Sequence, residues 1–335
     1  MSRIPKWDNA KAALIVCVIM GHLLDSYLKE ATIYRSGFIF IYMFHMPGFF
    51  LISGLFSKRF ADADQMDGHK VVPLLILCLI ENFIRYCTKV VFGDASLTVF
   101  NLRGSSWFLF TLSACYVITY LVRKTDALYV MIVAIVAACI ICYDKTLKGY
   151  FAVYRIANFF PFFYAGYLFD EEKIRKVLDQ KHIRILSLVI IIVFAFICWQ
   201  YPDIWKYKKL ITGANHYYVM KLPVNVWTWI YKLAYFCISM VITMAVLSII
   251  PSRRIPFATT VGKRTLTIFI LHFAVLACIN RIPWIESIAL NDRHLPALLL
   301  FAAISILTAL FLSLPLFSIP FQWILHPKRR KETSL

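Results

Sequence analysis

The amino-acid sequence predicts an all-α fold, a polytopic helix bundle in a membrane. Hydrophobic residues make up 61% of the 335 residues and charged residues only 16%, and the mean hydropathy is +0.71. A soluble domain carries about 45–50% apolar and about 25% charged residues. This chain therefore has more apolar side chain than a single core could bury, and lipid must surround the excess. The composition excludes a secreted globular protein, a disordered chain and an ordinary cytosolic enzyme.

Ten apolar stretches account for the bundle, because a helix that crosses a bilayer needs about 20 mostly apolar residues. The predicted transmembrane spans are 10–28, 37–56, 71–93, 106–122, 127–143, 150–169, 184–201, 226–250, 265–281 and 295–325. The first span lacks a small-residue cleavage site and carries a His and an Asp, so we expect a retained helix and not a signal peptide. The last is long enough to be tilted or broken, and Pro315 and Pro320 favour a break. With no internal repeat or soluble segment, residues 1–335 form one predicted membrane domain.

Loop charges predict the orientation of the bundle. The chain has 36 Lys and Arg against 18 Asp and Glu, a net charge of +18. With the N-terminus inside, 21 of the basic residues fall in cytoplasmic segments, 12 in outer loops and span edges, and 3 inside spans. This bias predicts that both termini are cytoplasmic. Orientation and attraction to anionic lipid headgroups explain the positive charge, so membrane lipid is a predicted partner and nucleic acid is not.

The nine cysteines carry no predicted metal or redox role. Most lie inside apolar stretches, and the CxxC of Cys139 and Cys142 has no second pair at metal-ligand spacing. We interpret them as small apolar residues, and no metal site is predicted.

Ionisable residues inside the spans carry the functional signal. Each costs roughly 2.5–3.5 kcal/mol on insertion, so it needs a partner or a wet cavity. Counting about 1.5 Å per residue inward from the outer span edges places polar groups of six helices at similar depth, slightly outside the midplane. They are His22, Asp25, His45, Glu81, Arg85, Arg155, Lys232 and His272. Scattered structural polar residues would not be expected to agree in depth, so a shared site is predicted.

Two histidines stand out as functional candidates. His22 follows Gly21, which lets another group approach closely, and Asp25 at i+3 can orient the imidazole or stabilise its imidazolium. His45 precedes Pro47, which frees a backbone carbonyl and bends the helix. Such a break either lines a cavity or is only a kink.

The other intramembrane polar groups also have structural explanations. Glu81 and Arg85 can form an i,i+4 pair that carries no chemistry. His272 is typical of a bundle histidine bonded to a backbone carbonyl. For Lys232 we favour a side chain that snorkels to the outer surface.

The cytoplasmic end of the first predicted helix carries a further candidate functional residue. Asp8 can cap this helix, and Lys11 lies at the cytoplasmic mouth. Ten residues separate Lys11 from His22, which puts them about 16 Å apart along the helix axis. Lys11 suits a phosphate entering from the cytoplasm and His22 suits chemistry at depth. The alternative for Lys11 is a plain positive-inside anchor.

Several motifs follow one another between residues 7 and 273. Lys11-x10-His22 stands within Trp7-Asp8-Asn9-Ala10-Lys11, and a long run reads Phe44-His45-Met46-Pro47-Gly48-Phe49-Phe50-Leu51-Ile52-Ser53-Gly54. Three weaker motifs continue the order: Trp107-Phe108-Leu109, Arg155 to Gly166 around Phe159-Phe160-Pro161-Phe162-Phe163, and Gly262-Lys263-Arg264-Thr265-Leu266 to His272. This order resembles the acyltransferase family 3 membrane proteins, and in particular their fucose 4-O-acetylase-like branch. Ala12, Gly48 and Arg264 depart from the family pattern, but no departure removes a proposed catalytic group.

The resemblance implies acyl transfer from acyl-CoA, usually acetyl-CoA, to a carbohydrate hydroxyl on a surface polysaccharide or lipid-linked glycan, in the bacterial cytoplasmic membrane. A hydroxyl needs a positioned base, and we expect His22, oriented by Asp25, to be that base. His45 would position the hydroxyl or assist proton transfer. Arg155 or Arg85, the latter paired with Glu81, would stabilise the oxyanion.

Binding roles follow for other residues. Lys11, Lys263 and Arg264 would hold the CoA phosphates on the cytoplasmic side. Trp107, Trp205 and His272 are the predicted substrate-binding residues. The outer loop 202–225, which contains Trp205, has the aromatic character of a sugar platform, although an interfacial aromatic belt explains it equally well.

Alternative functions stay open at this point. A flippase or transporter of a lipid-linked sugar would also place charges in a midplane cavity, without acyl transfer and without a base at His22. A membrane acyltransferase of the unrelated Asn/His type fits the chemistry but lacks the motif order. The residues are compatible both with direct transfer and with a histidyl-acyl intermediate.

Overall fold

The computed structural model describes residues 3–92, 102, 104–147, 150–220, 223–291 and 294–325, and these contain helices and no strand. The α-helices are α1 (Pro5–Ser26), α2 (Thr32–Tyr42), α3 (His45–Leu55), α4 (Lys58–Ala61), α5 (Gly68–Val91), α6 (Ser106–Val122), α7 (Ala127–Ile141), α8 (Val153–Leu168), α9 (Glu171–Leu178), α10 (Lys181–Gln200), α11 (Lys208–Ile211), α12 (Trp229–Ile249), α13 (Pro256–Lys263), α14 (Thr265–Ile279), α15 (Pro283–Leu290), α16 (His294–Leu312) and α17 (Pro315–Leu325). Short 3-10 helices are η1 (Tyr150–Ala152), η2 (Pro202–Tyr207) and η3 (Tyr217–Val219). The predicted all-α fold is confirmed.

Six described segments are long and apolar enough to cross a membrane: α1, α2 with α3, α5, α10, α12 and α16. The pair α13–α14, bent by 83°, makes a seventh if it counts as one span. Helices α6 and α7 occupy two further predicted spans but have only 17 and 15 residues. Ten spans therefore remain a prediction. The basic residues 103, 148, 221, 293 and 328–331, which entered the prediction of cytoplasmic termini, lie outside the described residues.

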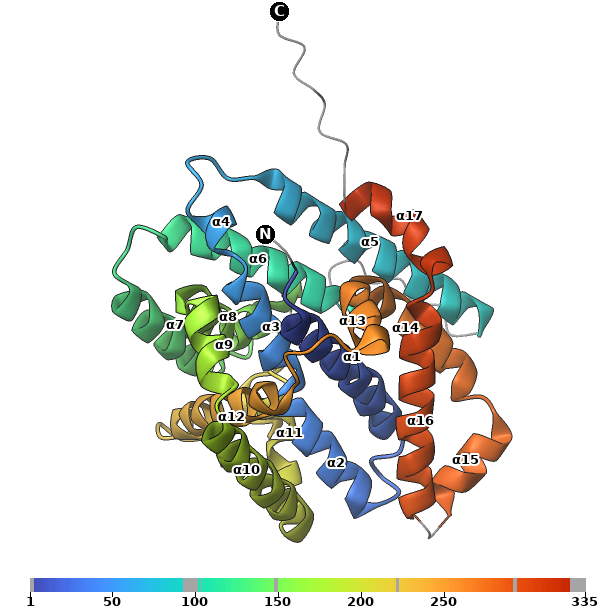
Figure 1. The fold of residues 1–335 in the computed structure, drawn as a ribbon. Helices are drawn as coiled ribbons and strands as arrows, with labels where there is room; N and C mark the ends of the chain where they lie inside the picture. The colour runs from blue at the N-terminus through green and yellow to red at the C-terminus, as the bar shows by residue number, and fades with distance from the viewer. Residues whose placement is uncertain are drawn as a thin grey trace, which may run out of the picture.

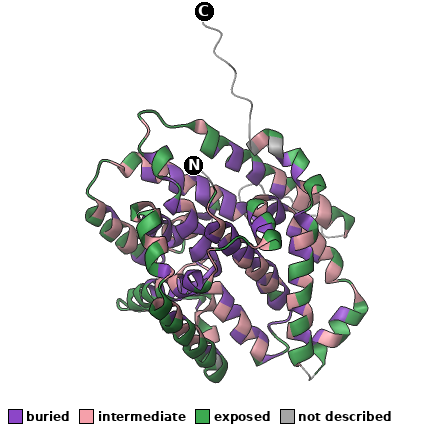
Figure 2. Cartoon of the chain, in the orientation of Figure 1, coloured by how far each residue is buried: buried purple, intermediate pink, exposed green. Residues whose placement is uncertain are grey.

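Helix α1 lies at the centre of the bundle (Figure 1) and packs against α2, α3, α13, α14 and α16. Its most apolar stretch is 56% buried, whereas that of α10 is only 17% buried. Figure 2 shows the same contrast, with buried residues gathered around α1 and exposed residues along α10. An apolar helix with so little of its surface covered by protein has a lipid-facing side, so α10 belongs to the periphery.

The second predicted span is interrupted where the sequence places Met46-Pro47. Helix α2 ends at Tyr42 and α3 begins at His45, so Pro47 lies in the first turn of α3, where its missing N–H is not needed. The freed carbonyl of Met43 accepts a hydrogen bond of 2.5 Å from the Ser239 hydroxyl on α12. The proline thus begins a new helix, and the break faces the protein interior.

The last predicted span is also broken, as expected. Helix α16 ends at Leu312 and α17 begins at Pro315, while Pro320 lies inside α17. A proline at the first helical position is favourable because its fixed φ suits the helix, so Pro315 sets the break.

Two predictions about local structure are wrong. Asp8 does not cap α1, because the helix already begins at Pro5 and Asp8 lies within its first turn, paired with Lys11 at 3.1 Å. Lys232 does not snorkel outward. Its side chain is buried and donates a hydrogen bond to the Asn158 amide oxygen on α8, so the bundle interior supplies the partner that snorkelling would otherwise seek.

Candidate active site

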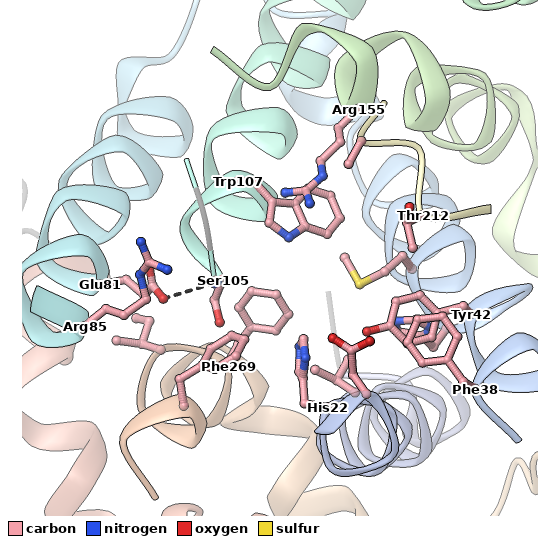
Figure 3. Close-up of a pocket in the computed structure, with 18 of the residues that line it drawn as sticks. His22, Phe38, Tyr42, Glu81, Arg85, Ser105, Trp107, Arg155, Thr212 and Phe269 are labelled. Atoms are coloured by element: carbon pink, nitrogen blue, oxygen red, sulfur yellow. Dashed lines mark hydrogen bonds between the residues drawn. The ribbon is translucent and has the colours of Figure 1, made fainter. Parts of the chain in front are cut away.

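A cavity of about 580 Å³ lies among α1, α2, α3, α5, α6, α8, α11 and α14 (Figure 3). The predicted substrate residue Trp107 lines it. All six residues predicted as catalytic also line it: His22, Asp25, His45, Glu81, Arg85 and Arg155. The structure therefore brings together side chains whose similar depth was counted from the sequence. The predicted residues Lys11, Lys263, Arg264, Trp205 and His272 are not among the lining residues of this cavity.

His22 projects from α1 between α2 and α14. Its ring stacks on that of His272 with a centroid distance of 5.4 Å and lies 4.4 Å from the Phe273 ring. The preceding Gly21 allows α2 to come close, because a Cβ at this position would stand 2.9 Å from the Tyr42 ring. The predicted close approach at Gly21 is confirmed, and it brings the Tyr42 ring to the His22 side of the cavity (Figure 3).

Asp25, one turn beyond His22, has a partner in the segment 208–215, which begins with α11 and is called the outer segment below. Its Oδ1 accepts a hydrogen bond of 2.7 Å from Lys208 on α11. The Lys208 ammonium also lies 4.6 Å from the Phe38 ring centre. The carboxylate predicted to orient His22 is thus engaged by α11, and its action on His22 stays a prediction.

The break between α2 and α3 fixes the ring of His45. Its Nδ1 lies 2.8 Å from the Ile41 carbonyl oxygen, and its side chain is buried. A carbonyl only accepts, so Nδ1 carries the hydrogen and Nε2 of the neutral ring keeps its lone pair. This tautomer follows from the hydrogen-bond geometry and equips Nε2 to take a proton.

His272 is held in a similar way. Its Nδ1 donates to the carbonyls of Phe269 at 2.9 Å and Ile268 at 3.2 Å, which confirms the predicted bond of a bundle histidine. Its buried Nε2 has no hydrogen-bond partner among the described residues. A substrate contact by His272 stays a prediction.

Glu81 links α5 to the start of α6. Its Oε1 accepts a hydrogen bond of 3.0 Å from the backbone N–H of Ser105, the N-cap residue of α6, and the Arg85 guanidinium lies beside it (Figure 3). A carboxylate at a helix N-terminus is favourable because the helix dipole is positive there. The Glu81–Arg85 pair therefore also has a structural role: it holds the start of α6, and Trp107 lies two residues after Ser105.

Arg155 presents a cation to the cavity on an aromatic support. Its guanidinium carbon lies 4.2 Å from the centre of the Trp107 ring, and Trp107 stacks on Phe159 at 5.4 Å. The Nε of Arg155 has no hydrogen-bond partner in the part of the chain that the structure describes. A donor held in this way suits a negative charge that develops during a reaction.

The predicted CoA-binding residues lie at the other end of α1. The Asn9 side chain donates to the carbonyls of Pro251 and Arg253 and accepts from Thr259 of α13. These bonds hold the first turns of α1, including Lys11, against the α12–α13 connection. Lys263 ends α13 and is exposed, and Arg264 donates to the Ser313 carbonyl.

The outer segment contributes residues that sequence reasoning missed. Ile211, Thr212, Ala214 and Asn215 line the cavity, as do Tyr42, Ser105 and Phe159. Trp205, the predicted platform residue, packs instead against the Phe38 ring at 5.8 Å. Tyr42 could have been found from its position three residues before His45, but no local signal marks residues 211–215.

Comparison with known proteins gives the family. The acyltransferase domain family matches residues 4–318. The nodulation protein NolL of Sinorhizobium fredii is 28% identical over 227 residues, 61% of this chain and 60% of the relative. The nodulation protein NolL of Mesorhizobium japonicum is 27% identical over 219 residues, 60% of this chain and 51% of the relative.

The aligned region thus spans between half and two thirds of these curated relatives. No solved structure matches the chain. Because the family match covers nearly the whole sequence and the apolar helices have spanning length, the chain belongs to acyltransferase family 3 and is a multi-pass membrane protein.

Proposed function

We propose that the protein is a membrane O-acetyltransferase. It moves an acetyl group from cytoplasmic acetyl-CoA to a sugar hydroxyl of a cell-surface polysaccharide or its lipid-linked precursor, in the bacterial cytoplasmic membrane. The observation that carries this proposal is that three helices bring His22, His45 and Arg155 into the same cavity. Family membership supports acyl transfer as the reaction class.

The side chains supply the parts of an acyl transfer. His22 takes the proton of the acceptor hydroxyl as its oxygen attacks the thioester carbonyl. Arg155, with Arg85, stabilises the negative charge on that carbonyl oxygen. Collapse of the tetrahedral intermediate breaks the carbon–sulfur bond, and the proton held by the imidazolium passes to the departing CoA thiolate. The products are the sugar ester and free CoA.

His45 has a supporting part in this reaction. Its Nε2 lone pair, left open by the bond between Nδ1 and the Ile41 carbonyl, accepts a hydrogen bond from the acceptor hydroxyl. That contact orients the attacking oxygen toward the thioester carbon.

Donor and acceptor approach from opposite ends of α1 in this proposal. Lys11, Lys263 and Arg264 bind the CoA phosphates at the cytoplasmic side, while Trp107, Trp205 and His272 contribute to acceptor binding. Support for the division comes from α1 itself, which carries Lys11 and His22 about 16 Å apart along its axis.

The test measures O-acetyl groups on the surface glycan of the host by proton NMR. A gene deletion is complemented with the wild type, with His22→Ala, or with His182→Ala as an exposed-histidine control on α10, at matched membrane abundance. We expect loss of one acetyl signal in the deletion and in His22→Ala, and recovery with the wild type and the control. Retained signal with His22→Ala would refute the assignment of the base.

A second readout separates this function from transport. Membranes that contain the protein should release thiol from acetyl-CoA in an acceptor-dependent way. A flippase or transporter would release none.

A further inference from the structure

A buried polar cluster lies behind the wall of the cavity, centred on Lys232 and Asn158. Both side chains are at most 1% exposed. The Lys232 ammonium donates to the Asn158 amide oxygen and lies 5.3 Å from the Tyr235 ring centre and 5.7 Å from that of Phe236. Neither residue lines the cavity, so neither has a place in the reaction proposed above.

Asn158 connects the cluster to the outer segment that covers the cavity. Gly213 packs directly on the Asn158 amide and has a φ of +62°. A Cβ at Gly213 would stand 2.4 Å from the Asn158 amide nitrogen, so only glycine fits both the backbone conformation and the contact. On either side of Gly213, Thr212 and Ala214 line the cavity. Asn158 is therefore in direct contact with this part of the wall.

The same cluster reaches the helix break that presents His45. The Asn158 amide donates to the Tyr235 hydroxyl at 3.4 Å, and Tyr235 also hydrogen-bonds Ser239. Ser239 donates to the Met43 carbonyl, two residues before His45. Buried hydrogen bonds thus run from Lys232 on α12 to Asn158 on α8, return to Tyr235 and Ser239 on α12, and end at the α2–α3 break.

Asn158 also stands one turn after Arg155 on α8 and next to Phe159, which supports Trp107. Asn158 is thus linked to three parts of the cavity wall: to Arg155 along α8, to the segment 211–215 through Gly213, and to the His45 break through Tyr235 and Ser239.

We infer that Lys232 and Asn158 are positioning residues, which hold the outer segment and the His45 break in the geometry that the cavity needs. Lys232 fixes the Asn158 amide by donating to its oxygen, and this leaves the amide nitrogen for Tyr235 and for the contact with Gly213. The expected effect on kcat rests on the proposed acetyl transfer, whereas the expected effect on hydrogen exchange in the outer segment does not.

Hydrogen exchange tests the structural part on the full chain in lipid nanodiscs. The reporter is the peptide covering 208–216, where Thr212 N–H bonds to Lys208 and Gly213 N–H to Leu210. We expect Lys232→Met to speed exchange in this peptide by about tenfold or more, because a buried acceptor loses its donor. Lys206→Met, an exposed lysine bonded to Asp203 in η2, should leave exchange unchanged.

A double variant separates positioning from folding. Lys232→Met with Asn158→Leu replaces both polar partners by apolar groups, so the buried unsatisfied oxygen disappears and folding is expected to recover. The outer segment should nevertheless stay fast in exchange, because its tie to the Asn158 amide is gone. In the thiol-release assay, kcat should fall about tenfold while KM for acetyl-CoA is unchanged.

Two results would overturn the inference. One is wild-type exchange at 208–216 and wild-type kcat in the folded double variant, which would make the cluster a space-filling part of the core. The other is faster exchange spread evenly over α1 and α14, and not concentrated in the reporter peptide 208–216. If the wild type itself releases no thiol, the proposed acetyl transfer fails, and the exchange measurement still decides the positioning role.

Discussion

The two cavity histidines differ in what holds them. His45 is tied by Nδ1 to the Ile41 carbonyl, whereas His22 is confined by the rings of His272 and Phe273. Because the His45 ring is held through one nitrogen only, the other nitrogen is not needed for its position. Its Nδ1–H stabilises the helix break, and its Nε2 remains for chemistry.

That separation yields a residue-scale prediction. In His45→Asn the amide nitrogen stands near the position of Nδ1, so the bond to Ile41 survives and Nε2 is lost. We expect normal membrane abundance and a drop in glycan O-acetylation of about 10²-fold, a typical contribution of a proton-handling side chain. The companion variant His272→Asn, with the same kind of backbone bond, should fold equally well. Equal, near wild-type acetylation in both would contradict a chemical role for His45.

At the scale of helices, single carboxylates join elements that are distant in sequence. Asp179, between α9 and α10, accepts hydrogen bonds from Lys6 of α1 at 3.0 Å, from Arg184 of α10 at 2.6 Å and from Ser252 after α12. Burial alone raises the pKa of the Asp179 carboxyl, but the hydrogen bonds from Ser252, Lys6 and Arg184 outweigh it and hold the pKa below its ordinary value.

A lowered pKa fixes the sign of the pH dependence. The stability that Asp179 contributes is fully present above the ordinary carboxyl pKa of about 3.9 and is lost as pH falls through the lowered folded value. We expect Asp179→Asn to cost about 1–2 kcal/mol at pH 7, and the stability gap to the wild type to start narrowing at about pH 4 and to close as the pH falls through the lowered pKa. Thermal unfolding in detergent from pH 7 to pH 3 measures this. Asp203→Asn, an exposed carboxylate, is the control, and a gap constant with pH would contradict the assignment.

At the scale of the molecule, the sequence predicted the helical fold and many of the polar residues that line the cavity. It did not predict which residues from distant parts of the chain pack against them. The depth of a residue along its helix follows from its position in the sequence alone, so polar residues of six predicted helices could be assigned to one layer before their packing was known. Partners that come from elsewhere in the chain have no local signal. Lys232 was assigned outward because Asn158 lies 74 residues away, and Lys208 was missed as the partner of Asp25 for the same reason.

In the proposed reaction, the two substrates bind at opposite ends of α1. The Lys11 end is held against the α12–α13 connection by Asn9, and the His22 end opens to the cavity beneath α11. If the CoA phosphates bind at Lys11, that contact is the same in the ground state and the transition state. Its loss then changes binding and leaves the chemical step intact.

Lys11→Gln should therefore raise KM for acetyl-CoA by about tenfold or more, the effect of one charge-assisted hydrogen bond, with little change in kcat. Lys176→Gln, an exposed lysine paired with Glu172 on α9, is the matched control, since a general loss of positive surface charge would affect both variants alike. Thiol release from acetyl-CoA by membranes with equal protein content gives both constants. A fall in kcat at unchanged KM would place Lys11 in the chemical step, and equal effects of the two variants would reduce it to a membrane anchor.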